Sequence, residues 1–150
     1  KKNSKVFKMN SVISKAKRVI VGKVLPEEDL IDKIREMVHK FEIKSGLVNV
    51  IGAFKKFTLG YYDIPKKDYL FKTFEENVEL VSCMGNIAHK DGEPIIHLHA
   101  MVGRPDYSII GGHLDQPSIV SVTGEVYIYE IDKVLERKND PQFDLSLLDI

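Results

Sequence analysis

The stretch HLHAMVGRPDYSIIGGHL, residues 97–114, contains three of the five histidines of the chain. Two of them are separated by a single residue, and the third follows a pair of glycines. The dipeptide Pro105-Asp106 near the middle is a turn signal, and apolar residues are frequent on both sides of it. This pattern predicts two antiparallel strands joined by a short turn.

The histidine spacing predicts a metal site. Because successive side chains of a strand point to opposite faces, His97 and His99 share one face and lie about 6.5–7 Å apart along the strand. Gly111-Gly112 permits a close backbone approach, so an antiparallel return brings His113 toward the first two histidines. Three converging imidazoles suit zinc, with Zn–N bonds of about 2.0–2.1 Å and a fourth position open to water or a ligand. A solvated strand face without metal is the alternative interpretation.

The other face of the same strand is apolar and is expected to pack against a helix; it comprises Ile96, Leu98, Ala100 and Val102. Asp115 and Glu125 are candidates to orient a metal-bound imidazole through its second ring nitrogen, although the simpler interpretation of each is a surface carboxylate. We interpret His39 and His89 as surface residues. The lone cysteine, Cys83, lies in an apolar run and is expected to pack in the core.

The rest of the chain predicts an α+β fold. The β-branched segment 17–25 indicates a first strand, and apolar residues at steps of three and four predict one long helix between Pro26 and Gly46. After Gly46 nearly every segment is typical of a strand. Consecutive strands with short turns indicate an antiparallel sheet, with the helix on one face. The expected strands are 47–54, 56–64, 68–76, 78–89, 94–103, 107–114 and 118–131, with a further turn signal at Gln116-Pro117.

Length and composition favour a single domain, since 150 residues with 43% hydrophobic content can form one core. No apolar run is long enough to span a bilayer, so a cytoplasmic protein is expected.

The 22 basic and 22 acidic residues cancel, which argues against strong attraction to nucleic acid. Residues 1–23, however, hold eight Lys or Arg and no acid. Residues 1–14 therefore form either a basic arm able to contact phosphates or an ordinary solvated start of the first strand. Residues 133–150 form a tail with apolar positions, expected to dock on the domain or on a neighbouring subunit.

The order of these motifs resembles the plants-and-prokaryotes conserved domain, the PPC domain. The resemblance covers about residues 15–132, and its most specific pieces are the His-x-His at 97–99, the Gly-Gly-His at 111–113 and the Thr-Gly-Glu at 123–125. It implies an antiparallel sheet of about seven strands flanked by helix and assembled as a homotrimer.

Bacterial and archaeal members of this family are commonly described as candidate DNA-binding proteins, and plant members bind AT-rich minor grooves through an attached AT-hook. The nearest piece here, GRPD at 103–106, lacks the first arginine of such a hook and ends in an acid. We interpret it as a turn.

Three hypotheses about function follow. The first is a homotrimer with a three-histidine metal site, acting as a regulatory or interaction module that holds a small ligand at the metal and contacts DNA weakly through its basic arm. The second is a zinc-dependent enzyme that acts on a small molecule through metal-activated water, with Glu125 as a candidate acid or base. The third is a structural trimer without metal. The sequence favours the first.

Overall fold

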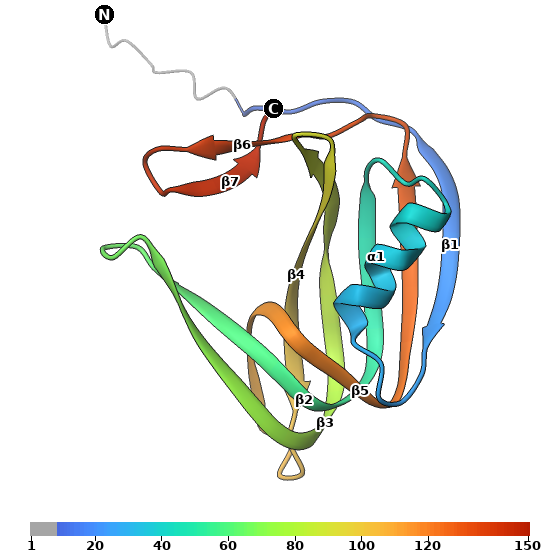
Figure 1. Cartoon of the computed structure of the whole chain (residues 1–150), viewed down its shortest axis with the longest axis vertical. Helices are drawn as coiled ribbons and strands as arrows, with labels where there is room; N and C mark the ends of the chain where they lie inside the picture. Colours follow the sequence, from blue (N-terminus) through green and yellow to red (C-terminus); the bar gives the residue numbers. More distant parts are fainter. Residues whose placement is uncertain (1–8) are drawn as a thin grey trace, which may run out of the picture.

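The computed structural model describes residues 9–150, which fold into long antiparallel strands and one short helix (Figure 1). The predicted α+β class is confirmed. The elements are β1 (Ala16–Val24), α1 (Leu30–Lys40), β2 (Gly46–Asp63), β3 (Asp68–Lys90), β4 (Glu93–Gly103), β5 (Ile109–Ile131), β6 (Arg137–Asp140) and β7 (Leu145–Leu148).

The main sheet has five strands in the order β1-β5-β2-β3-β4, and β4 also pairs with the start of β5. The paired strands β2, β3, β4 and β5 therefore form a closed ring. β6 and β7 make a separate two-stranded hairpin. The expected single sheet of about seven strands is thus replaced by five long strands and a hairpin.

Bulges explain this difference. Segments 47–54 and 56–64 are one continuous strand, β2, whose register shifts between Phe54 and Lys56. Likewise, the expected turn at Gln116-Pro117 lies inside β5, where the register with β2 shifts. A bulge adds a residue to one strand and bends it without ending it, so its sequence can look like a turn. Figure 1 shows β2 and β3 bending together.

The helix is shorter than predicted, with 11 residues from Leu30 to Lys40. Glu27, which was expected in the first turn, has φ +74°, a left-handed conformation that an α-helix excludes. Asp29 is the N-cap instead, because its carboxylate accepts hydrogen bonds from the backbone of Ile31 and Asp32. The chain leaves the helix at the other end through Glu42, with φ +52°. No helix within residues 9–150 is long and apolar enough to cross a membrane.

The core lies between α1 and the inner face of the sheet, as the period-two pattern predicts. Leu98, Ala100 and Val102 are buried, and Ile96 is partly buried against them. The helix contributes the buried side chains Leu30, Ile31, Ile34 and Val38. Cys83 is also buried, and burial raises the pKa of its thiol to about 12. It packs as a small apolar side chain, as expected.

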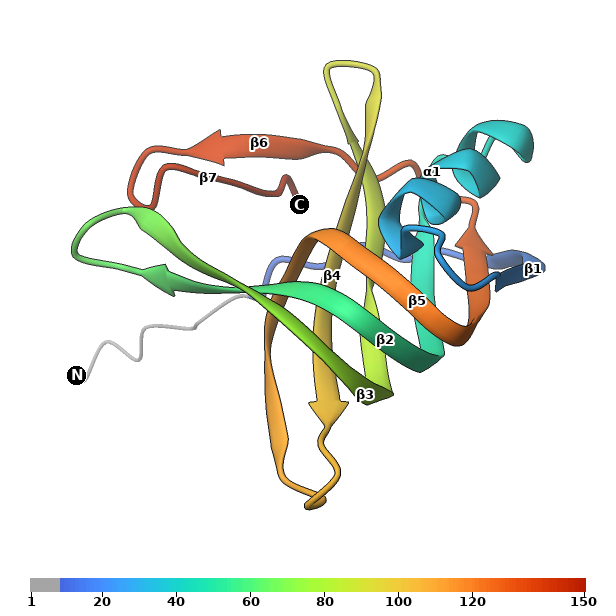
Figure 2. The same cartoon turned by 60° about the horizontal axis from the view of Figure 1, so that its bottom comes forward.

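The tail is held against the rest of the chain. Within residues 133–150 the β6–β7 hairpin receives a hydrogen bond from Lys90 Nζ to Ser146 Oγ, 2.7 Å long. The distal part of β2 also reaches the hairpin, where the Tyr62 hydroxyl donates to the backbone carbonyl of Phe143. Figure 2 shows the far end of the β2–β3 pair beside this hairpin. Residues 1–8 of the expected basic arm lie outside the described residues.

Asp29 connects the helix to β5, and its replacement tests how much the fold depends on that link. One carboxylate oxygen accepts the helix N–H groups, and the other accepts from the N–H of buried Ser118 at 2.8 Å. We predict that Asp29→Ala lowers the free energy of unfolding by about 2–4 kcal/mol, because it removes the cap and leaves the Ser118 N–H without a partner. Urea unfolding followed by circular dichroism measures this loss.

Asp32→Ala is the matched control, because Asp32 is exposed in the first turn and binds only Arg35 there. Its cost should stay below about 1 kcal/mol. Equal costs for the two variants would show that the link to β5 contributes nothing.

Candidate metal centre

The structure brings His97, His99 and His113 together, and one ring nitrogen from each lies within 4.8 Å of the others. The strand registers produce this cluster. His99 lies opposite Met84 of β3 on one side and opposite His113 of β5 on the other. His97, two residues earlier on the same face of β4, completes the triangle, with ring centroids 5.0 Å from His99 and 5.4 Å from His113.

The double glycine permits the approach of β5 on which this triangle depends. A Cβ atom at Gly111 would lie 2.6 Å from the carbonyl oxygen of Ala100, and one at Gly112 would lie 2.7 Å from that of Gly60. Both distances are shorter than real Cβ contacts. Any side chain at either position would push β5 away from β4 or β2, and His113 would move with it.

The donor set fits a divalent transition metal. His97 Nε2 and His99 Nε2 lie 3.1 Å apart, close to the separation of about 3.3 Å between neighbouring ligands of a tetrahedral zinc with bonds of about 2.0–2.1 Å. His113 Nδ1 is buried and has no hydrogen-bond partner among the described residues. Three imidazoles without a thiolate or a carboxylate are a ligand set that suits zinc and other borderline metals.

His97 is half-buried beside a cation from the tail. Arg137 of β6 lies with its Nη2 3.3 Å from His97 Nδ1 and donates to the side-chain oxygen of Asn86 at 2.6 Å. Burial, the positive charge of Arg137 and the two neighbouring imidazoles together lower the pKa of His97 to about 4. His97 is therefore neutral at physiological pH, which is the form that binds a metal.

An aromatic wall from β3 flanks His113. The ring of Tyr69 lies 4.8 Å from the imidazole, and Phe71 stacks on Tyr69. Burial lowers the pKa of His113, whereas the carboxylate of Asp115, two residues along β5, acts in the opposite direction. Asp115 is thus the candidate outer carboxylate that the structure places near a histidine of the cluster.

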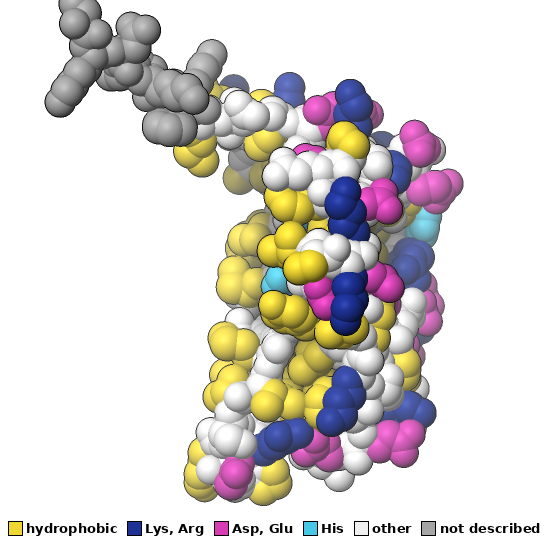
Figure 3. Space-filling view, turned by 90° about the vertical axis from the view of Figure 1, so that its left-hand side faces the viewer, with side chains coloured by type: hydrophobic (Ala, Val, Ile, Leu, Met, Phe, Trp, Pro, Cys, Tyr) yellow, Lys and Arg dark blue, Asp and Glu magenta, His cyan; other side chains and the backbone are white. Residues whose placement is uncertain are grey.

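His99 is the exposed member of the cluster and lines a shallow concavity of about 310 Å³ together with Met84 and Met101. On the face seen in Figure 3, hydrophobic side chains surround a histidine side chain that reaches the surface. A small ligand could therefore reach the histidines from solvent.

The remaining sequence candidates lie elsewhere. Glu125 pairs with Ile51 of β2, whereas His113 pairs with Gly60 of the same strand. The two partners are nine residues apart along β2, so Glu125 lies away from the histidines. His39 is exposed on the helix, as expected. His89 is half-buried rather than on the surface, because its backbone N–H binds the carbonyl of Leu135 where the tail crosses β3.

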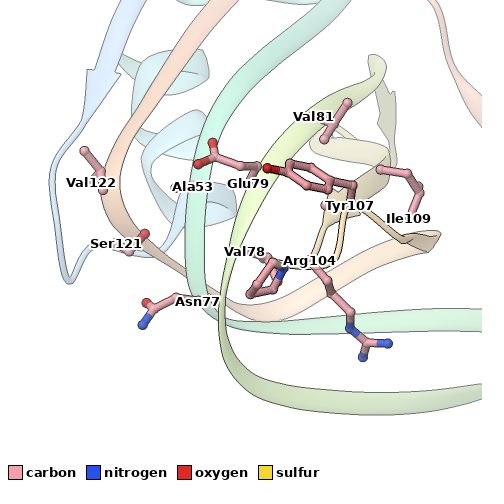
Figure 4. A pocket seen from close by; sticks show the side chains of 12 residues that line it. Ala53, Asn77, Val78, Glu79, Val81, Arg104, Tyr107, Ile109, Ser121 and Val122 are labelled. Carbon is pink, nitrogen blue, oxygen red and sulfur yellow. The ribbon is translucent and has the colours of Figure 1, made fainter.

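A second concavity, of about 550 Å³, lies away from the histidines and has mostly apolar walls. Figure 4 shows Val81 and Val122 on either side of it, with Tyr107 extending toward Glu79. It continues into a neighbouring hollow that includes Ile51 and Glu125. Glu125 is therefore part of this apolar region and not of the histidine site.

Sequence reasoning missed Arg137, Asn86 and Tyr69. The alternation of Tyr69 and Phe71 along one strand could have suggested an aromatic face. Arg137 lies in a polar stretch, ERKND, in which no local feature distinguishes a buried arginine from a solvated one.

Comparison with known proteins agrees with this fold. In this chain the pairing of a Gly-Gly-His strand with a His-x-His strand closes an antiparallel sheet, which carries a histidine cluster. The sequence profile of the Plants and Prokaryotes Conserved domain, abbreviated PCC or PPC, matches residues 12–132, and the chain belongs to this family. Among proteins with curated descriptions, none matches the chain.

Several solved structures are similar over most of the chain. The metal-containing protein AF0104 from Archaeoglobus fulgidus is 29% identical, with a TM-score of 0.87, and the match covers 95% of this chain and 100% of that one. A PPC protein from Pyrococcus horikoshii is 29% identical, with a TM-score of 0.86 and coverage of 95% and 98%. A protein from Bacteroides thetaiotaomicron, named a "putative DNA binding protein", is 28% identical, with a TM-score of 0.84 and coverage of 91% and 96%.

Proposed function

We propose that the protein is a homotrimeric PPC-domain module that binds one divalent metal ion per chain, zinc in the first instance, through His97, His99 and His113. The convergence of three imidazoles on one point carries this proposal. A similar archaeal protein is named as metal-containing, which supports it. The bound metal would supply a Lewis-acidic position open to a small ligand, and the role of the module would be regulation or interaction.

Ligand binding is favoured over hydrolysis by what surrounds the histidines. Glu125, the acid–base candidate of the enzyme hypothesis, lines the apolar hollow near Ile51. Asp115 already accepts the backbone N–H of Gln116 at 2.7 Å. Glu125 is not beside the cluster, and one oxygen of Asp115 is engaged by the backbone, so an enzyme that activates water there has less support than a binding module.

Metal analysis tests the site. After loading with zinc and extensive dialysis, we predict about one zinc per chain for the wild type and almost none for His99→Ala, because two imidazoles rarely hold zinc against dialysis. His99 is the exposed member of the cluster, so its loss should leave the far-UV circular dichroism spectrum unchanged. Elemental analysis gives the stoichiometry.

His39→Ala is the matched control, since His39 is exposed on the helix far along the chain from the cluster. It should keep its zinc. Wild-type protein that remains free of metal after loading would overturn the proposed site.

Self-association is supported by an apolar outer face of the main sheet. The registers align Val19, Tyr129 and Leu47 in one row across three strands, so these exposed side chains are contiguous. Large exposed apolar patches mark interaction surfaces. The resemblance to the family implies three subunits, and this face is the natural contact between them. Its large exposed residues are Val19, Val21, Leu47, Ile51, Tyr127 and Tyr129.

We predict that light scattering at micromolar concentration gives about three times the chain mass of 17.1 kDa. Tyr127→Glu should shift the protein to monomer, because it places a charge among apolar side chains that association would desolvate. Tyr61→Glu is the control, since Tyr61 is 71% exposed on another part of β2. A monomeric wild type would contradict the assembly.

We further propose that any contact with DNA is weak and electrostatic. The similar structure from Bacteroides thetaiotaomicron is named a "putative DNA binding protein". In this chain the charge is balanced overall, and one of the basic residues near the start, Arg18, is already paired with buried Glu130 at 2.6 Å. The lysines of residues 1–10 remain as the main source of phosphate contacts.

Deletion of residues 1–10 should therefore abolish most DNA binding, and the binding of the full chain should fall steeply as salt rises, since each phosphate contact releases counterions. Fluorescence anisotropy with a labelled duplex at two salt concentrations measures both effects. Tight binding at physiological salt that survives the deletion would contradict this proposal.

A further inference from the structure

The group beside His97 Nδ1 is a hydrogen-bond donor, whereas a metal-binding histidine usually has an acceptor there. A metal-bound imidazole normally donates its second N–H to a carboxylate, a carbonyl or water. Here the group beside His97 Nδ1 is the guanidinium of Arg137, at 3.3 Å. A guanidinium can only donate, so His97 Nδ1 faces a donor and a positive charge where an acceptor is expected.

The charge of Arg137 is buried and uncompensated. The residue is 8% exposed, and its hydrogen bonds go to neutral oxygens: the side-chain oxygen of Asn86, at 2.6 Å, and the backbone carbonyl of Ser146, at 2.9 Å. Its Nε has no partner among the described residues, and no carboxylate of residues 9–150 forms an ion pair with it. Buried charges are normally paired, so this arrangement favours a negative charge brought by a bound ligand.

The histidine cluster itself supplies no negative charge. Its three candidate ligands are imidazoles, which carry no negative charge, and among residues 9–150 the acid whose charge acts on one of them is Asp115, near His113. A divalent metal would therefore add two positive charges to a site that already contains the guanidinium of Arg137. Only the imidazole ring of His97 lies between that guanidinium and the nitrogen, Nε2, that would bind the metal. Such a site favours a negatively charged group strongly.

We propose that Arg137 makes the histidine site selective for a metal together with a small oxyanion, such as a carboxylate or phosphate group. Arg137 weakens the binding of the metal alone and strengthens the binding of the anion at the metal. This inference rests on the proposed metal site. Arg137 belongs to β6, outside the residues 12–132 that match the family, so the selectivity is supplied by the tail of this chain.

The test measures two affinities whose changes should have opposite signs. Zinc affinity is measured by competition with a coloured chelator, and anion affinity by the visible spectrum of the cobalt-loaded protein titrated with acetate or with phosphate. Arg137→Gln should bind zinc about 10-fold tighter, since glutamine removes the charge and can accept from His97 Nδ1–H. The same variant should bind the anion about 10-fold more weakly. The stronger of the two probes identifies the class of anion.

Asn86→Asp is a second variant that keeps Arg137 in place. The aspartate has nearly the same shape as the asparagine and pairs with the guanidinium across the existing 2.6 Å contact, which neutralises its charge. It should shift both affinities in the same directions as Arg137→Gln. Lys90→Gln is the control, because it removes a cation and a contact to Ser146 of the hairpin without touching the histidines. It should change neither affinity.

The outcomes separate the two proposals. A wild type that takes up no metal overturns both the proposed site and this inference. A protein that binds zinc, but in which Arg137→Gln and Asn86→Asp weaken both affinities or change neither, overturns only the inference. Arg137 would then be a structural contact of the hairpin.

Discussion

The close approach of β5 to both β4 and β2 at Gly111 and Gly112 is the constraint on which the rest of the structure depends. It closes the ring of strands, since β4 and β5 pair from His99–His113 to Gly103–Ile109. It also determines the site, because the register that closes the ring places His113 opposite His99. Gly111 and Gly112 are thus required both for closure of the sheet and for the position of His113. The core on the inner face and the histidines on the outer face are two consequences of one strand pairing.

The alternation of apolar and polar residues predicts which side chains share a face of one strand. The buried face of Leu98, Ala100 and Val102 and the common face of His97 and His99 follow from alternation alone. The convergence of His113 could also be expected, because a turn and two glycines limit where that strand can return. The predicted helix is too long because Pro26 and the acidic residues after it resemble a first helical turn, whereas Glu27 takes a left-handed conformation and Asp29 is the N-cap. Strand bulges were mistaken for turns, because both interrupt a pattern with similar residues.

Contacts between distant segments left no local signal. Arg137 reaches Asn86 across 51 positions of sequence, and its burial depends on how the tail hairpin docks on β3 and β4. Tyr69 meets His113 only because β3 pairs with β2 along its whole length. These residues set the electrostatics and the walls of the site, while the histidines set its ligands. The histidine cluster of the proposed metal site can therefore be predicted from sequence, whereas the groups that surround it cannot.

The central claim is that the three histidines bind one metal through their ring nitrogens. X-ray absorption spectroscopy at the zinc edge of the zinc-loaded wild type tests it most directly. The account predicts a first shell of three imidazole nitrogens at about 2.0–2.1 Å and one further light atom, with the outer-shell scattering that imidazole rings produce. A shell that contains sulfur, or one with fewer than three imidazoles, would contradict it.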